Sequence, residues 1–278
     1  MPLFQNIKKE LRKHSTLTIL IAVNIVLFFI LNVSIGIFNT QAVVNQLVLP
    51  LNLHTFILKP WTLFTYMFSH VGLGHVFYNM LLLYFSAQLF LSFLSEKQFL
   101  FVYIMSGITG GVILLILSAF FPEAFATSQL FGASAAMLGI VACLCIYRPD
   151  MPVMFFGIIQ MKYKYMALII FVSYTIIDFN INTGGKISHF GGALFGLLFG
   201  YLLKQGKDLS SLALFTWKKK SPLRVVQNNT IPANKPVMPN SANQQHTIDS
   251  LLDKINKIGY ENLSKTEKEL LFKLSQKK

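Results

Sequence analysis

Residues 131–139 read Phe-Gly-Ala-Ser-Ala-Ala-Met-Leu-Gly and open one of the hydrophobic segments of this 278-residue chain. The segment is too apolar to be a surface loop, and it holds more small residues than an ordinary lipid-facing helix. One serine, Ser134, lies near its start with alanine on both sides. We therefore predict a membrane protein that folds around Ser134, with this serine as a nucleophile.

The composition assigns the chain to the α-helical membrane proteins. Hydrophobic residues make up 54% of the sequence and charged residues only 13%, against roughly 25% charged residues in a soluble domain. The mean hydropathy is +0.55. The apolar residues form runs of about 20, which is the length that a helix needs to cross roughly 30 Å of hydrocarbon.

Six such spans are predicted, so the fold class is all-α: a polytopic six-helix membrane bundle followed by a cytoplasmic helical tail. Residues 39–60 are apolar but interrupted by Asn and Pro, which predicts a structured or membrane-dipping loop. Residues 148–162 are predicted as a turn followed by a short apolar piece. The six spans cover residues 16–38, 73–94, 99–121, 130–147, 163–177 and 187–203.

The distribution of Lys and Arg orients these spans. With the N-terminus in the cytoplasm, 22 of the 24 Lys and Arg residues lie on the cytoplasmic side, and only Lys59 and Lys186 lie in outer loops. Both termini are therefore predicted to be cytoplasmic. The plasma (inner) membrane is expected because no transit peptide is recognised. The net charge of +13 does not indicate a nucleic-acid partner, because the basic residues gather beside the spans and in the tail.

The chain divides into five predicted parts. In order they are a basic cytoplasmic N-terminus (1–15), the membrane domain (16–204), an amphipathic segment at the lipid surface (205–220), a flexible linker (221–245) and a cytoplasmic helical hairpin (246–278). In the hairpin, Gly259 is predicted to end the first helix, and Ser264 with Glu267 to form a capping box for the second. We expect this hairpin to be a docking element without chemistry.

Ionisable residues inside a membrane span are costly and usually functional. None of the 11 Asp and Glu residues lies in the core of a predicted span. His75 and Asn79 lie at the start of the second span. Ser134 lies near the start of the fourth span, and His189 lies near the start of the sixth. Because the even-numbered spans all run from outside to inside, these four residues are expected at similar depth in the outer third of the bilayer.

The helical phase of these residues indicates which faces meet. At 100° per residue, His75 and Asn79 lie about 40° apart and share a face. On the fourth span, Gly132 and Gly139, with the alanines between them, offer a flat surface for another helix. On the sixth span, His189 shares a stripe about 80° wide with three glycines that let helix backbones approach closely, namely Gly192, Gly196 and Gly200.

Close packing of the fourth and sixth spans would bring His189 onto Ser134. A serine in contact with a histidine provides the nucleophile and the general base of serine acyl-transfer chemistry. His75 and Asn79, on a neighbouring helix, could supply side-chain donors to an oxyanion. The joint pattern of depth and face, rather than any single residue, favours this interpretation.

Three other interpretations remain open at this point. Taken alone, each polar residue is explained by packing, because a membrane serine often bonds a carbonyl of its own helix. A transporter or channel also places polar residues in the membrane, although it tends to carry carboxylates and half-helices at the midplane. A zinc site formed by His70, His75 and His189 is disfavoured, because histidines five residues apart do not share a helix face.

Three motifs, in order on the second, fourth and sixth spans, resemble the signature of the rhomboid intramembrane serine proteases. They are H-x4-H-x3-N at residues 70–79, G-x-S at 132–134 and H-x2-G-x3-G at 189–196. The resemblance covers about residues 16–204 and leaves the tail outside. It implies a six-helix bundle around a water-filled cavity that opens to the outer side, with no metal or cofactor. The implied partners are membrane lipid and single transmembrane helices, which are cut near their outer ends.

The resemblance also implies roles for four residues. Ser134 would be the nucleophile and His189 the general base of a dyad without a third acid. His75, Asn79 and the backbone N–H of the serine would form the oxyanion hole. An inactive relative that binds membrane helices without cutting them is the remaining alternative, because three family positions differ. Where the family often has glycine after the serine, tyrosine four residues after it and Trp-Arg in the first loop, this chain has Ala135, Leu138 and Trp61-Thr62.

Overall fold

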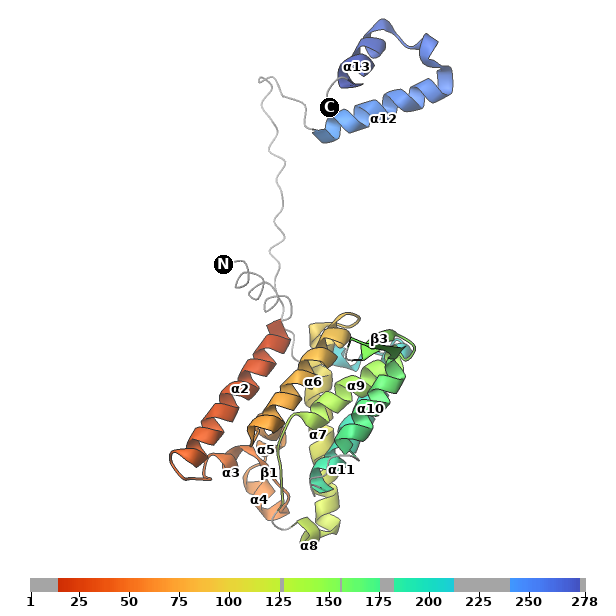
Figure 1. The fold of residues 1–278 in the computed structure, drawn as a ribbon. Helices are drawn as coiled ribbons and strands as arrows, with labels where there is room; N and C mark the ends of the chain where they lie inside the picture. The colour runs from red at the N-terminus through yellow and green to blue at the C-terminus, as the bar shows by residue number, and fades with distance from the viewer. Residues whose placement is uncertain (1–14, 126–127, 156, 176–182, 213–240, 276–278) are drawn as a thin grey trace. The chain divides into compact units, whose positions relative to one another are not determined.

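The structure is a computed structural model that describes residues 15–125, 128–155, 157–175, 183–212 and 241–275. The chain divides into two compact units, Met1–Lys218 and Lys219–Lys278. Helices dominate both units, as the predicted fold class requires (Figure 1). Most of the predicted basic N-terminus, the predicted lipid-surface segment beyond residue 212 and the linker up to residue 240 lie outside the described residues.

Helices occupy the positions of all six predicted spans in the first unit. They are α2 (Ser15–Gly36), α6 (Leu73–Leu91), α7 (Glu96–Phe120), α9 (Ser134–Tyr147), α10 (Tyr163–Thr175) and α11 (Thr183–Lys204). Within the described part of the chain, three helices are long and apolar enough to cross a membrane, and they run over Ser15–Gly36, Glu96–Phe120 and Gly184–Lys204. These helices agree with a polytopic membrane protein.

The predicted start of the fourth helix is wrong. The sequence predicts a helix from residue 130, but Leu130 belongs to the short strand β2 (Gln129–Leu130), which pairs antiparallel with β1 (Leu49–Pro50). The chain then turns at Gly132, whose φ of 110° lies far from the helical region. Helix α9 therefore begins only at Ser134. Hydropathy could not locate this turn, because residues of the strand and the turn are as apolar as the helix.

The predicted start of the sixth helix is also wrong, in the opposite direction. The sequence predicts it from residue 187, whereas α11 begins at Thr183. Its first turn has low hydropathy, yet Gly184 and Gly185 are buried. A helix turn covered by protein does not need lipid-compatible side chains, so a hydropathy window starts the span too late. His189 lies six residues after Thr183, the first described residue of this helix.

The segment between α2 and α6 is structured, as predicted for residues 39–60. Trp61 donates its indole N–H to the carbonyl oxygen of Gln46 at 2.9 Å. Tyr66, which is fully buried, donates its hydroxyl to the carbonyl oxygen of Gly107 on α7 at 2.6 Å. These bonds attach the segment to itself and to the helix bundle. Its elements are α3 (Val44–Leu47), β1, α4 (Leu53–Leu58), α5 (Thr62–Thr65) and the 3-10 helix η1 (Tyr66–Phe68).

A short β-hairpin replaces the predicted turn and apolar piece at residues 148–162. Strands β3 (Pro152–Phe155) and β4 (Ile159–Lys162) pair antiparallel, and Gly157 between them has a φ of 70°. Short apolar runs cannot be assigned to helix or strand by periodicity alone, which explains why the hairpin was not predicted. Two further short elements of this unit are α8 (Pro122–Phe125) and η2 (Leu209–Leu212).

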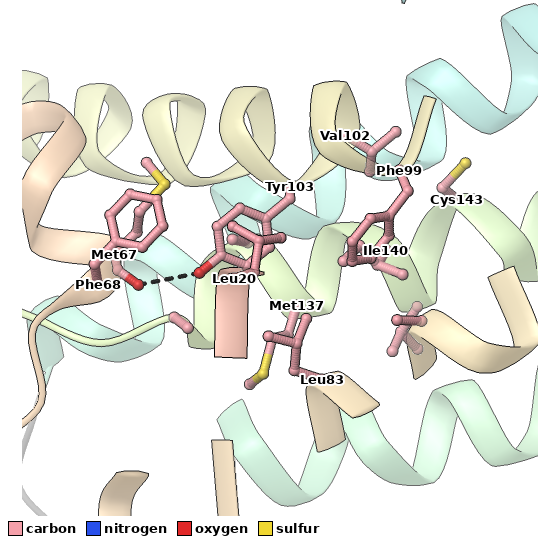
Figure 2. Close-up of a cluster of buried hydrophobic side chains, with 14 of the residues drawn as sticks. Leu20, Met67, Phe68, Leu83, Phe99, Val102, Tyr103, Met137, Ile140 and Cys143 are labelled. Carbon is pink, nitrogen blue, oxygen red and sulfur yellow. Dashed lines mark hydrogen bonds between the residues drawn. The ribbon is translucent and has the colours of Figure 1, made fainter. Parts of the chain in front are cut away.

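Helix α9 lies in the middle of the first unit, in contact with α6, α7, α10 and α11 (Figure 1). Its first eleven residues are all buried. Figure 2 shows the core, where side chains of the surrounding helices meet those of α9 around Tyr103. The hydroxyl of Tyr103 donates to the carbonyl oxygen of Met67 at 3.2 Å. Because protein surrounds the start of α9, its small residues face neighbouring helices rather than lipid.

The second unit contains the predicted helical hairpin, formed by α12 (Ser241–Ile258) and α13 (Lys265–Ser275) with the 3-10 helix η3 (Tyr260–Asn262) between them. Gly259 has a φ of 80° and follows the end of α12, as predicted. The predicted linker is wrong at residues 241–245, which are helical. Alanine and glutamine in this stretch are good helix formers, so a polar composition did not prevent a helix.

Replacing Glu267 with alanine is expected to loosen α13. Lys254 donates to this carboxylate at 2.6 Å, and the backbone N–H of Ser264 donates to it at 3.0 Å in the predicted capping box. These bonds lower the pKa of Glu267 to about 2. Because the pKa of Glu267 is lower in the folded hairpin than in the unfolded chain, the ionised carboxylate stabilises the hairpin at any pH above the unfolded-state pKa. This contribution is lost as pH falls towards 2.

Hydrogen exchange of the full-length protein measures this effect. We expect peptides from α13 to exchange several-fold faster in Glu267→Ala than in the wild type at neutral pH. The difference should shrink as pH falls below about 4.5, the ordinary value for this side chain. Glu269→Ala, at an exposed position two residues further along, should exchange like the wild type. Equal protection in all three proteins at neutral pH would refute the role of the capping box.

Candidate active site

Ser134 is the first residue of α9. The chain just before it is hydrogen-bonded to the segment between α2 and α6. The backbone N–H of Gly132 donates to the carbonyl oxygen of Tyr66 at 2.9 Å. A Cβ added at Gly132 would lie 2.9 Å from the imidazole ring of His75. The positive φ and this close contact both require glycine. The turn therefore places the start of α9, and Ser134 with it, beside the histidine of α6.

The backbones of α9 and α11 are in direct contact along the stripe of glycines that was predicted on the sixth span. A Cβ at any of three glycines of α11 would overlap a carbonyl oxygen of α9, in the pairs Gly192 with Ala135, Gly196 with Gly139 and Gly200 with Cys143. Because both partners advance by four residues from pair to pair, the two helices run parallel. The prediction for Gly132 is wrong, since this residue precedes α9 and contacts His75 instead of α11.

Counting along the two parallel helices explains how the corrected starts still bring the site together. Ser134 lies thirteen residues before the end of α9 at Tyr147, and His189 lies fifteen residues before the end of α11 at Lys204. At 1.5 Å per residue these lengths are about 20 Å and about 23 Å. Both are shorter than the roughly 30 Å of a bilayer core. The two side chains therefore reach similar heights along the pair of helices.

The structure brings Ser134 and His189 into direct contact. The serine Oγ lies 2.6 Å from His189 Nε2. The side chains belong to different helices, and only 9% of the serine and 6% of the histidine is exposed. Hydrogen bonds are electrostatically stronger in such surroundings than in water. The pair has the geometry of a nucleophile and the base that takes its proton.

A backbone carbonyl defines the tautomer of His189. Its Nδ1 lies 3.1 Å from the carbonyl oxygen of Tyr174 on α10. A carbonyl oxygen can only accept, so Nδ1 carries the proton and donates it to this bond. Nε2 is then an acceptor for the hydroxyl of Ser134. This is the tautomer that a general base needs, and it follows from the two hydrogen-bond partners of the ring.

The tyrosine that provides this carbonyl was not predicted. The ring of Tyr174 also lies edge-on to the imidazole of His189, with centroids 6.3 Å apart. Leu138, at the position where the family often has a tyrosine, is buried with 1% exposure. The available signal was a tyrosine in the last turn of the fifth predicted span, near the end where the other polar residues gather.

His75 and Asn79 lie one turn apart on α6, and the ring of His75 lies beside Gly132, just before α9. The side-chain N–H of Asn79 donates to the carbonyl oxygen of His75 at 2.8 Å, one turn earlier on the same helix. The buried amide has a second N–H to offer. His70, in the segment before α6, accepts a bond from the backbone N–H of Ala133 at 3.4 Å. Its ring meets the ring of His75 edge-on at 5.1 Å.

A second glycine contact positions α11 and was also missed. A Cβ at Gly110 of α7 would lie 2.6 Å from the carbonyl oxygen of Ser188, and one at Gly191 of α11 would lie 2.8 Å from the Cα of Gly110. Ser188 immediately precedes His189, so α7 packs directly against the turn of α11 that carries the histidine. The adjacent glycines at residues 110–111, within an apolar span, were the signal for this contact.

Comparison with known proteins agrees with the motifs. Residues 58–206, more than half of the chain, match the family model described as "Rhomboid domain". Residues 239–277 match "Family of unknown function (DUF6576)". The chain is 30% identical over 124 residues to "Rhomboid protease GluP" of Bacillus subtilis (strain 168). That similarity covers 42% of this chain and 23% of the relative, so the chain spans about a quarter of the relative's length. The chain therefore belongs to the rhomboid family.

Proposed function

We propose that the protein is an intramembrane serine endopeptidase with Ser134 as nucleophile and His189 as general base. The contact of 2.6 Å between Ser134 Oγ and His189 Nε2 carries this proposal. Two features support it: the membership of the rhomboid family and the similarity to a relative that is named a protease. The reaction class is hydrolysis of a peptide bond in or near a transmembrane helix.

In the proposed first step, His189 Nε2 takes the hydroxyl proton of Ser134 while Oγ attacks the substrate carbonyl carbon. The tetrahedral intermediate collapses when the protonated histidine gives this proton to the leaving amine, which leaves an acyl-enzyme. A water molecule then repeats the sequence, with Nε2 as its base, and releases the new carboxyl terminus. No metal or cofactor takes part in these steps.

The proposed oxyanion hole lies at the start of α9. The first intrahelical bond of α9 joins the Met137 N–H to the Ala133 carbonyl, so the N–H of Ser134 precedes the regular bonding pattern of the helix. The helix N-terminus also favours negative charge. His75 and the second amide N–H of Asn79 are the proposed side-chain donors. Each donor of this kind contributes roughly 3 kcal/mol in soluble acyl-transfer enzymes.

We infer that the six helices listed above all span the membrane and that both termini are cytoplasmic. The Lys and Arg distribution supports this orientation, which places the start of α9 towards the outer side. The proposed location is the plasma membrane. The proposed domain division keeps a basic N-terminus, the membrane domain, a lipid-surface segment, a linker ending at residue 240 and the hairpin of α12 and α13.

The proposed substrates are membrane proteins with a single transmembrane helix. We infer that such a helix unwinds beside Ser134. Exposing backbone polar groups in lipid costs several kcal/mol per group. Cleavage should therefore favour segments rich in residues that form helices poorly.

Labelling with a fluorophosphonate tests the proposed nucleophile in the purified full-length protein. We expect one adduct, which peptide mapping assigns to Ser134. Ser118→Ala is the matched control, because this buried serine of α7 donates to the carbonyl of Leu115 on its own helix at 2.8 Å. It should label like the wild type. A transporter, a channel or an inactive relative should not label at Ser134, so an unlabelled wild-type protein would refute the proposed function.

A further inference from the structure

Tyr174, near the end of α10, contacts two helices through three different groups. Its backbone carbonyl accepts from His189 Nδ1 on α11 at 3.1 Å. Its ring lies edge-on to the imidazole at 6.3 Å and 66°. Its hydroxyl donates to the backbone carbonyl of Tyr78 on α6 at 3.3 Å. One residue therefore joins the helix of the histidine to the helix that carries His75 and Asn79.

The carbonyl and the ring act on the imidazole in complementary ways. The carbonyl selects the tautomer with the proton on Nδ1, so that Nε2 faces Ser134 as an acceptor. When the histidine takes the serine proton, the same carbonyl accepts from a charged donor, and such charge-assisted hydrogen bonds are stronger than neutral ones. The edge-on ring of Tyr174 lies at a centroid distance typical of favourable aromatic pairs. It restricts rotation of the His189 imidazole about the Cβ–Cγ bond.

The hydroxyl keeps the other two groups in place. Tyr174 is the twelfth residue of α10. The bond to Tyr78 attaches it to α6, which is packed against α9 and α7. The position of the carbonyl and the ring relative to His189 is thereby linked to the helix that also carries the proposed oxyanion donors.

We propose that Tyr174 is the positioning residue of His189: its carbonyl and ring hold the imidazole towards Ser134, and its hydroxyl anchors both on the backbone of α6. This proposal rests on the proposed function, because it assigns Tyr174 a task in the same reaction. Tyr174 does not touch the reacting atoms. Its contribution is to keep Nε2 in line with the serine hydroxyl.

Two variants separate the parts of this arrangement. Tyr174→Phe removes only the anchor, and Tyr174→Leu removes the anchor and the ring. Phe171→Leu is the matched control, because Phe171 packs edge-on against Phe190 of α11 with centroids 5.1 Å apart. It removes a similar aromatic contact between the same two helices, one turn away, from a residue with no part in the proposed site.

The test measures the fluorophosphonate labelling rate as a function of pH, the kcat and KM for a transmembrane substrate, and the melting temperature. We expect Tyr174→Leu to lower the labelling rate and kcat about 10-fold, since small misplacements of catalytic groups have effects of this order. KM should stay unchanged, and the midpoint of the pH profile should shift. Tyr174→Phe should lower both rates about 3-fold. Phe171→Leu should retain the wild-type rates whatever its melting temperature.

The outcomes distinguish this proposal from the proposed function. A wild-type protein that is not labelled at Ser134 refutes the function itself. A labelled wild type with Tyr174→Leu at the same rate and pH midpoint refutes only the positioning role, as does an equal loss in Phe171→Leu. If Tyr174→Leu does not fold, Tyr174→Phe provides the test. An unchanged labelling rate in Tyr174→Phe refutes the anchoring role of the hydroxyl.

Discussion

Cleavage of a single-span membrane substrate is expected to fall by at least about 10³-fold when Ser134 is replaced by alanine. The same loss is expected for His189→Ala. Ser134 Oγ and His189 Nε2 are 2.6 Å apart, and neither can perform the proposed proton transfer and attack without the other. Without the nucleophile no acyl-enzyme forms. Without the base the hydroxyl stays protonated in a buried site, where it is a poor nucleophile.

The double variant sharpens this prediction. Residues that act as one unit have non-additive effects on rate, so Ser134→Ala combined with His189→Ala should be no slower than either single variant. Ser118→Ala and His54→Ala are the controls, because one is a buried serine bonded within its own helix and the other is an exposed histidine of α4. Both should keep wild-type turnover. Substantial cleavage by either single site variant would rule out the assigned dyad.

The largest expected effect on folding comes from Gly196→Ala. A Cβ at this position would overlap the carbonyl oxygen of Gly139 on α9, and a helix backbone cannot yield as a flexible side chain can. We expect a loss of about 3 kcal/mol of stability, at the upper end of typical overpacking costs. The melting temperature in detergent should fall. Labelling of Ser134 should fall with it, because Gly196 lies two turns from His189 on the seam that holds α11 against α9.

Gly36→Ala is the matched control for this substitution. Gly36 ends α2, is exposed, and has no atom within 4 Å of an added Cβ. Alanine is favoured over glycine in helices by up to about 1 kcal/mol, so this variant should be unchanged or slightly more stable. If Gly196→Ala melts and labels like Gly36→Ala, the backbone contact between α9 and α11 does not hold the site together.

The helices could be located from the sequence because lipid imposes a length and a composition on any segment that crosses it. The contact between α9 and α11 was also predictable, since glycines at every fourth residue leave one face without side chains. Both features are local. They depend on residues within one helix and on a periodicity that the sequence displays directly.

The start of α9 could not be predicted in the same way. It depends on β2 pairing with β1, on the bond from Gly132 to Tyr66 and on the ring of His75, which come from distant parts of the chain. The early start of α11 likewise depends on protein covering its first turn. Hydropathy describes the preference of a segment for lipid, and it is uninformative where a segment is surrounded by protein.

The sequence by itself determined that this is a helical membrane protein of the rhomboid type, and that Ser134 and His189 lie on helices shaped to pack closely. Only the tertiary structure decided which atoms meet. The proton position on His189 follows from the carbonyl of Tyr174, on a helix that carries no motif. A backbone carbonyl has the same chemistry in every residue, so its role depends on where the fold places it.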